Sequence, residues 1–220
     1  MKTLEELGVN DIKIFQDDQL YRFTSDAILL SRFVKVTAKD TVADFCSGSG
    51  IVGLHLYALN PFLKSVALFE MQEELYSLSL ESIKVNGLEK IFSAYNVRVQ
   101  DLSREHFSRY SLIVCNPPYM RENDGGKEKN SCIAMCKREI TINLSEIFDM
   151  AKKCLKFGGR ICMVNKAERL ADVIFEMRKN KIEPKKLQFI RGANKEPYLF
   201  LIEGVKGGKQ GLKVLKEAEN

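Results

Sequence analysis

Apolar positions along the middle of the chain fall into short runs that alternate with stretches of helical spacing. A run such as 111–115 has the length of a buried strand, whereas 73–85 repeats its apolar residues every three or four positions. The second stretch ends at Asn86-Gly87, a common helix stop. The pattern predicts strands at 41–46, 65–70, 94–99, 111–115, 160–164, 187–191 and 198–204, and helices at 51–59, 73–85, 145–155 and 168–179.

Strands that alternate with helices indicate βαβ units and therefore an α/β fold with a doubly wound, largely parallel sheet. The expected sheet has seven strands, and no helix separates the last two, so we expect one antiparallel strand near the C-terminus. Without repeats or low-complexity linkers, residues 1–220 are predicted to form a single domain. Residues 1–40 would be an N-terminal cap segment and 206–220 a basic tail, whose end is expected to fray.

A glycine-rich loop follows the first of these parallel strands. In DFCSGSGIVG, residues 44–53, Gly48, Gly50 and Gly53 have the spacing G-x-G-x-x-G between a strand and a helix. Glycines there let the backbone approach a ligand at the carboxyl edge of the sheet. Glu70 ends the next strand and could accept hydrogen bonds from ribose hydroxyls. The motif taken alone is also compatible with NAD or with a structural turn.

Two carboxylates favour a different nucleoside ligand. Asp44 ends the first strand, where it would repel a pyrophosphate but could bind an ammonium group. Asp101 follows the third strand and could accept the exocyclic amino group of adenine. An adenosine that carries a cationic amino acid and no phosphate fits these residues. We therefore predict S-adenosylmethionine as the cofactor.

The fourth strand runs into Asn116, Pro117, Pro118 and Tyr119. Prolines remove backbone donors and hold the chain extended, so the strand must end here with a rigid bend. An amino group conjugated with a ring is a poor nucleophile because its lone pair is delocalised. The side-chain oxygen of Asn116 and the carbonyl of Pro117 could accept its two hydrogens and free that lone pair, which is electrostatic preorganisation.

This arrangement predicts methyl transfer to a planar nitrogen. Tyr119 could stack on a flat substrate and hold it in the plane of attack. The motif itself does not choose among adenine N6, cytosine N4, guanine N2 and a glutamine amide. A proline stop with a chance tyrosine is the structural alternative.

Composition limits the other classes of function. Apolar residues make up 45% of the chain, and no apolar run approaches the roughly 20 residues of a membrane span. The N-terminus has no apolar core of a signal peptide, so we expect a cytoplasmic protein that is not membrane-bound. The six cysteines are scattered, and Cys132 and Cys136 alone do not complete a zinc site. We expect reduced, structural cysteines and no metal.

Positive charge is concentrated near the C-terminus. The net charge is +5, and 178–216 carries eleven lysines and arginines against three glutamates. Such a stretch suits a polyanionic partner such as nucleic acid. Ordinary solvated lysines on exposed faces are the alternative explanation.

With the glycine loop and the NPPY motif placed, the sequence resembles the class I S-adenosylmethionine-dependent methyltransferases of the N6-adenine type. More closely, it is similar to the bacterial family that methylates adenine N6 beside the anticodon of valine tRNA. The likeness covers nearly the whole chain, in YRFTSDAILLSRF (21–33), DFCSGSGIVGLHL (44–56), FEMQEEL (69–75), VNGL (85–88), VCNPPY (114–119), REI (138–140), ERL (168–170) and LIEGVKGGKQGL (201–212).

The resemblance implies roles for particular residues. The region around Phe23, Thr24, Ser25 and Asp26 would cap the cofactor, although Thr24 or Ser25 could instead be a helix N-cap. Cys46 stands where many class I enzymes have the first glycine. The methionine end of the cofactor would contact Asp44, Cys46, Gly48 and Gly50, the nucleoside would contact Glu70, Met71, Asp101 and Leu102, and the target base would contact Asn116 to Tyr119.

The leading hypothesis is thus a tRNA adenine-N6 methyltransferase whose 178–216 region binds phosphates. Enzymes that methylate protein glutamine use the same NPPY motif to activate an amide. They usually carry an N-terminal helical domain, and only about 40 residues precede Asp44 here. DNA adenine methylation would need a separate recognition domain. A domain that binds cofactor or RNA without turnover is the non-enzymatic alternative.

Overall fold

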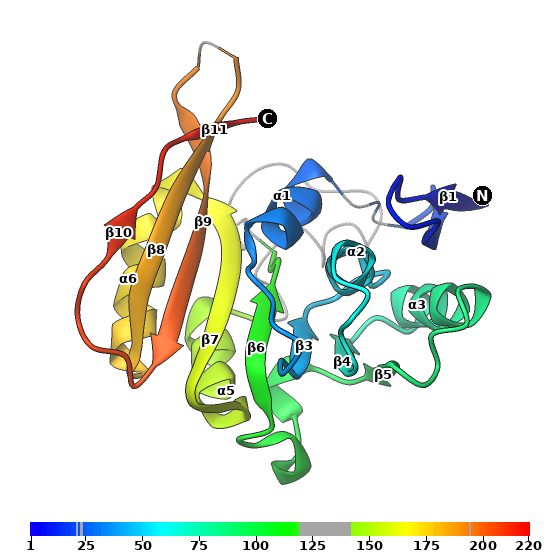
Figure 1. Cartoon of the computed structure of the whole chain (residues 1–220), viewed down its shortest axis with the longest axis horizontal. Helices are drawn as coiled ribbons and strands as arrows, with labels where there is room; N and C mark the ends of the chain where they lie inside the picture. The colour runs from blue at the N-terminus through cyan, green and yellow to red at the C-terminus, as the bar shows by residue number, and fades with distance from the viewer. Residues whose placement is uncertain (21, 23, 119–141, 194) are drawn as a thin grey trace.

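A twisted central sheet with helices on both faces organises the chain (Figure 1). The computed structural model describes residues 1–20, 22, 24–118, 142–193 and 195–220. The strands of the sheet follow the order β10-β8-β9-β7-β6-β3-β4-β5, and β11 also pairs with β8. Their bounds are β3 Val42–Phe45, β4 Val66–Glu70, β5 Phe92–Asn96, β6 Tyr110–Cys115, β7 Leu155–Lys166, β8 Ile182–Arg191, β9 Pro197–Lys206, β10 Lys213–Val214 and β11 Ala218–Glu219.

The directions of the strands match the expected fold class. Strands β3 to β7 pair in parallel, whereas β9 lies between β7 and β8 and is antiparallel to both. The prediction of one antiparallel strand near the C-terminus is therefore confirmed. The seven expected strands are present from β8 to β5, and the short strands β10 and β11 raise the number in the sheet to nine.

The two faces of the sheet carry separate hydrophobic cores. On one face, buried residues of α1 and α2 pack with Leu68 and Val114, and on the other, α5 and α6 pack with Phe69 and Ile113. Figure 1 shows α5 and α6 on the far side of β6 and β7 from α1 and α2. The helices are α1 Ser25–Phe33, α2 Ile51–Leu59, α3 Glu73–Val85, α5 Leu144–Cys154 and α6 Leu170–Lys179, with short 3-10 turns η1 Val99–Asp101, η2 Arg104–His106 and η3 Ala167–Arg169.

Most predicted bounds are close to the observed ones. Helices α2 and α3 begin and end at the predicted residues. Strand β5 lies at Phe92–Asn96 rather than at 94–99, because 99–101 turn into η1. Strand β7 is longer than predicted, since it begins directly after α5 at Leu155.

The two ends of the described chain differ from the expectation. Strands β1 (Lys2–Glu6) and β2 (Lys13–Asp17) form a hairpin that docks on α3, where Asn86 bonds the backbone N–H and C=O of Lys13. The tail does not fray, because β10 and β11 pair with the edge of β8. The edge of β8 presents backbone N–H and C=O groups to the tail, and the carbonyl of Leu187 accepts the N–H of Leu215.

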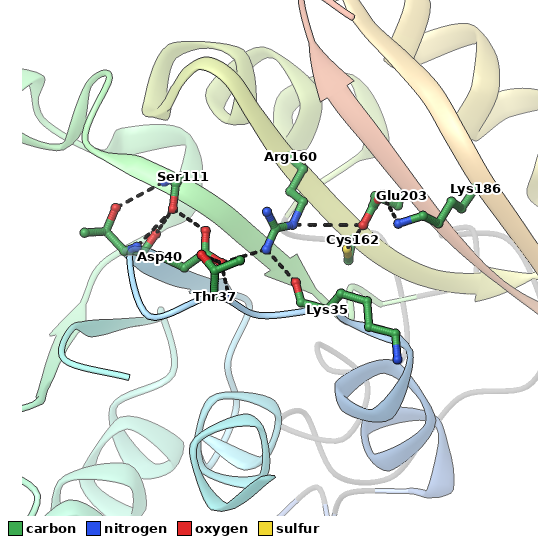
Figure 2. Close-up of polar contacts among 9 residues, drawn as sticks. Lys35, Thr37, Asp40, Ser111, Arg160, Cys162, Lys186 and Glu203 are labelled. Carbon is green, nitrogen blue, oxygen red and sulfur yellow. Dashed lines mark hydrogen bonds and ion pairs between the residues drawn. The ribbon is translucent and has the colours of Figure 1, made fainter. Parts of the chain in front are cut away.

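A partly buried polar cluster, centred on the buried carboxylates of Asp40 and Glu203, crosses the sheet at the amino ends of β3 and β6 (Figure 2). The Asp40 carboxylate accepts from Ser111 Oγ and from the Arg160 guanidinium, both at 2.7 Å. On β9, Glu203 accepts from Lys186 Nζ at 2.7 Å and lies 4.0 Å from Arg160 Nε. These charged contacts tie the loop before β3 to β6, β7, β8 and β9, at the edge opposite the glycine loop.

Candidate active site

The predicted site residues come together because of the order of the strands. Strand β3 lies between β4 and β6, and all three are parallel, so their carboxyl ends meet at one edge of the sheet. Asp44 pairs in register with Leu68 of β4 and Val114 of β6. The glycine loop after β3, Glu70 at the end of β4 and Asn116 after β6 therefore share this edge.

The glycine loop uses backbone conformations that favour glycine. Gly48 and Gly50 have φ of 56° and 86°, and Cys46 adopts a left-handed φ of 58° despite its side chain. A Cβ on Gly48 would meet no atom within 4 Å, so its backbone borders open space, whereas a Cβ on Gly50 would lie 3.0 Å from the Leu68 side chain. The loop thus presents backbone at Gly48 and packs tightly at Gly50, where α2 begins.

Asp44 is a buried carboxylate with one unused oxygen. Its Oδ2 accepts the Gly53 N–H at 2.9 Å, and its Oδ1 has no partner among the described residues. Burial raises the pKa of Asp44 to about 8; the Gly53 hydrogen bond opposes that rise, while repulsion from Glu70 adds to it. A cationic ligand at Oδ1 would stabilise the charged form, so this geometry fits an ammonium group.

Glu70 connects the glycine loop to the end of β4. Its two carboxylate oxygens accept from Gly48 N and Gln72 N, each at 2.8 Å. Burial raises the pKa of Glu70, although these backbone hydrogen bonds oppose the rise. Each oxygen keeps a second lone pair, which can accept from a ribose hydroxyl. The buried hydroxyl of Ser47 in the same loop also has no partner among the described residues. The donor and acceptor set therefore fits a nucleoside that carries a free amino acid and no phosphate.

The bend after β6 begins with a buried thiol. Cys115 is the last residue of β6, and Asn116, Pro117 and Pro118 follow it. Burial, together with a hydrogen bond to Cys46, raises the pKa of the Cys115 thiol. Both cysteines are free, as predicted, and the raised pKa disfavours Cys115 as a nucleophile. Tyr119 lies outside the described residues, as do Arg138 and Glu139.

Helix α1 carries the residues predicted to cap the cofactor. Thr24 occupies its N-cap position without a side-chain cap hydrogen bond, and Asp26 lies in its first turn. Ser31 Oγ and His55 Nδ1 lie 2.6 Å apart and join α1 to α2, the helix that follows the glycine loop. His55 is buried. Phe23 lies outside the described residues.

A hollow of about 440 Å³ lies beside the end of β5. Its lining includes Asp101 and Leu102 and an aromatic group that sequence reasoning missed, Tyr95 and His106. His106 Nδ1 lies 2.8 Å from the hydroxyl of Tyr110, and its ring meets Tyr95 edge to face. Asp101 itself is exposed, 3.8 Å from Arg98 Nε. No sequence pattern marked His106, because its role depends on packing between η2 and β6.

One further polar link joins this hollow to the end of β4. Asn96 also lines it, and its Nδ2 donates to the carbonyls of Glu70 and Met71, at 3.1 Å each. Of the four residues predicted to contact the nucleoside, Glu70 and Met71 are hydrogen-bonded to Asn96, and Asp101 and Leu102 line the hollow. Across the described ranges, no cluster of three or more His, Cys, Asp or Glu side chains could hold a metal ion. None of the helices in those ranges is long and apolar enough to cross a membrane.

Comparison with known proteins agrees with this geometry. Residues 10–183 match the family described as Methyltransferase small domain. The tRNA1(Val) (adenine(37)-N6)-methyltransferase of Shewanella frigidimarina is 23% identical over 158 residues, which are 70% of this chain and 62% of that relative. The chain thus spans about three fifths of the length of such curated relatives.

Solved structures share the fold at low sequence identity. A predicted O-methyltransferase from Agrobacterium tumefaciens superposes with a TM-score of 0.67 at 14% identity, covering 88% of this chain and 86% of that one. The M. jannaschii tRNA m1G37 methyltransferase gives a TM-score of 0.64 at 15% identity, covering 94% of this chain and 56% of that one.

The fold is that of the class I, S-adenosylmethionine-dependent methyltransferases, as the sequence predicts. The chain belongs to the methyltransferase small domain family, since the matched residues make up most of its length. The expectation of S-adenosylmethionine rather than NAD is confirmed at the level of this family and fold.

Proposed function

We propose that this chain transfers a methyl group from S-adenosylmethionine to the exocyclic N6 of an adenine in tRNA. The observation that carries the proposal is the convergence of Asp44, Gly48 and Glu70 with Asn116 and Pro117 at one edge of the sheet. The first three residues suit the cofactor, and the last two suit an amino group beside it.

The cofactor would be bound by polar groups that have hydrogen-bonding capacity left over among the described residues. Asp44 Oδ1 would accept from the ammonium group, and the exposed backbone at Gly48 would border the carboxylate end. Glu70 would accept from the ribose, and the hollow beside Leu102 would receive the adenine. Thr24 and Asp26, with Phe23, would cover the cofactor from α1, and Cys46 would lie beside its methionine end. When bound, S-adenosylmethionine supplies an activated methyl group.

The protein's own residues would prepare the nucleophile. Asn116 Oδ1 and the Pro117 carbonyl would accept the two hydrogens of the target amino group and free its lone pair. Pro117 and Pro118 hold that geometry before the substrate arrives, so little reorganisation is needed during the reaction. Tyr119, which lies outside the described residues, would stack on the base and hold it in the plane of attack.

Adenine in tRNA is favoured by the relatives and by the surface charge. Curated relatives are named as tRNA1(Val) (adenine(37)-N6)-methyltransferases, and one structural neighbour is a complex of aTrm5 with tRNALeu. Some cations in the basic region are paired, as Arg178 is with Glu183. Lys179 is exposed and paired with Glu176, and five other exposed lysines there could contact phosphates, namely Lys181, Lys195, Lys209, Lys213 and Lys216.

A labelling experiment tests the proposal. The purified chain is incubated with radiolabelled S-adenosylmethionine and either total cellular RNA or total protein, and the labelled polymer is digested to nucleosides or amino acids. We expect the label in N6-methyladenosine from the tRNA fraction. Label in methylglutamine would instead assign the site to protein substrates, and label in neither polymer would refute methyl transfer to these substrates.

A further inference from the structure

Asn165 is a buried amide with an unused donor near the carboxyl end of β7. Its side chain is 0% exposed, and its Oδ1 accepts the backbone N–H of Lys166 at 2.8 Å. Its Nδ2 is buried and has no hydrogen-bond partner among the described residues. Most buried amide donors in proteins are paired, because an unpaired one loses its bonds to water without replacement. An unpaired donor of this kind indicates an acceptor that the described residues do not supply.

Strand pairing places Asn165 at the same edge of the sheet as the proposed acceptors for the target amino group. Strand β7 runs parallel to β6, with Met163 opposite Cys115. Asn165 lies two residues beyond Met163 on β7, and Asn116 and Pro117 directly follow Cys115, the last residue of β6, so Asn165 lies at the edge of the sheet where the proposed acceptors begin. Because side chains alternate along a strand, Asn165 follows Met163 on the same face of the sheet.

We propose that Asn165 determines base specificity, by donating from Nδ2 to the ring nitrogen next to the amino group that is methylated. This inference rests on the proposed function. Adenine carries an acceptor nitrogen beside its N6 amino group, as cytosine does beside N4. On the Watson–Crick edge of guanine, the amino group instead neighbours an N–H donor. That donor would face the donor of Asn165 and could not form a hydrogen bond with it. A base extruded into a closed pocket is desolvated, so a fully buried donor can read it.

The contacts of Asn165 allow a nearly isosteric test. Asn165→Asp keeps the oxygen that accepts from Lys166 and replaces only the donor with a second acceptor. At high pH, that acceptor would face the ring nitrogen and repel it. At lower pH, a protonated carboxyl could donate again, so activity should recover.

Asn86→Asp is the matched control. Asn86 is a partly buried asparagine outside the basic region, and its Oδ1 accepts the backbone N–H of Lys13 while its Nδ2 donates to the carbonyls of Lys13 and Ser82. Its change to aspartate should lower thermal stability without altering how the enzyme treats RNA. A purely structural Asn165 would behave in the same way as Asn86.

The experiment measures kcat/KM for methylation of total tRNA by the full chain at several pH values. We expect Asn165→Asp to lower kcat/KM about tenfold or more near pH 8, with unchanged cofactor affinity and partial recovery at lower pH. Asn86→Asp should keep the wild-type kcat/KM and pH profile. If Asn165→Asp matches the wild type at every pH, the inference is overturned.

A second pair of variants covers the case in which the aspartate does not fold. Asn165→Ser and Asn165→Ala are similar in size, and only the serine hydroxyl can donate. The serine variant should retain kcat/KM several-fold above that of the alanine variant, and equal values would overturn the inference. A wild-type protein that labels no RNA refutes the proposed function together with the inference, whereas an active wild type with unaffected Asn165 variants refutes the inference alone.

Discussion

The backbone N–H of Gly48 donates to the Glu70 carboxylate across 2.8 Å, and this contact joins the glycine loop to the end of the neighbouring strand. The same carboxylate also accepts from Gln72 N. One buried side chain therefore fixes both loops between which the cofactor is proposed to bind. Its remaining lone pairs are available to the ribose.

Glu70→Gln should weaken cofactor binding by about tenfold or more, because the amide NH₂ cannot accept from Gly48 or from a ribose hydroxyl. Calorimetric titration with S-adenosylmethionine measures the effect. Glu74→Gln on the exposed first turn of α3 is the control and should bind like the wild type. Equal affinities for both variants would show that Glu70 does not hold the nucleoside.

Cofactor affinity should rise with pH because of Asp44. Burial raises the pKa of Asp44 to about 8, so near pH 6 the ligand-free protein carries a proton that a bound ammonium would displace. We expect binding to tighten by about tenfold per pH unit and to level off near pH 8. The Asp44→Asn variant should bind weakly with little pH dependence. A flat profile for the wild type would contradict the ammonium contact.

The same pKa has a consequence for stability without ligand. The folded protein holds the Asp44 proton, whereas the unfolded chain releases it near the ordinary pKa of 3.8. The contribution of protonated Asp44 to folding stability is therefore present at low pH and is lost as pH rises towards about 8. Asp44→Asn cannot ionise, so its thermal stability should fall less than that of the wild type between about pH 6 and 8. Parallel curves would contradict the raised pKa.

Gly53→Ala should destabilise the fold at the start of α2. The added Cβ would lie 2.7 Å from Leu68 Cδ2 and 3.3 Å from Asp44 Oδ2. Overpacking of this kind costs about 1–3 kcal/mol of the free energy of unfolding, measured by denaturant titration. Gly192→Ala is the control, since its Cβ would meet only the Lys195 side chain at ordinary distances. Equal stability of the two variants would contradict close packing at Gly53.

The cluster of Figure 2 should make Arg160 more important for stability than an exposed arginine. Arg160→Ala leaves the buried Asp40 carboxylate without its cation, and losses of about 3–5 kcal/mol are typical when one partner of a buried pair is removed. Arg109→Ala, at an exposed residue, is the control for loss of charge. Chemical denaturation at neutral pH measures both, and equal losses would contradict the structural role of the cluster.

The exposed lysines of the basic region should contribute to tRNA binding. Changing Lys209, Lys213 and Lys216 to glutamate should weaken binding of bulk tRNA and flatten its dependence on salt, because fewer counterions are released. Lys64, Lys84 and Lys90, which are exposed outside the basic region, form a control set of the same size when changed to glutamate. An equal loss for both sets would show that binding follows net charge alone.

Local signals in the sequence were sufficient for the central elements. Helix α3 ends where Asn86-Gly87 predicts, and the apolar run before Asn116 is a buried strand. The β1–β2 hairpin was not predicted, because its strands have mixed charge and are held by contacts with Asn86, about 70 positions away. Strands β10 and β11 have two residues each and exist only through pairing with β8.

The candidate site likewise contains residues that could be predicted from the sequence and residues that could not. Asp44, Gly48 and Glu70 could be predicted because motif spacing and strand order bring them to one edge. Asn165 could not, since its sequence context is an ordinary strand end, and only the pairing of β7 with β6 brings it to the edge where β6 ends. The Arg160 cluster also depends on tertiary contacts, because its members lie far apart in the sequence.

A crystal structure with bound S-adenosylmethionine tests the central claim most directly. We predict the ammonium group at Asp44 Oδ1, the ribose hydroxyls at Glu70 and the methyl group directed towards Asn116 and the Pro117 carbonyl. A cofactor bound elsewhere, or a methyl group directed away from those two oxygens, would contradict it.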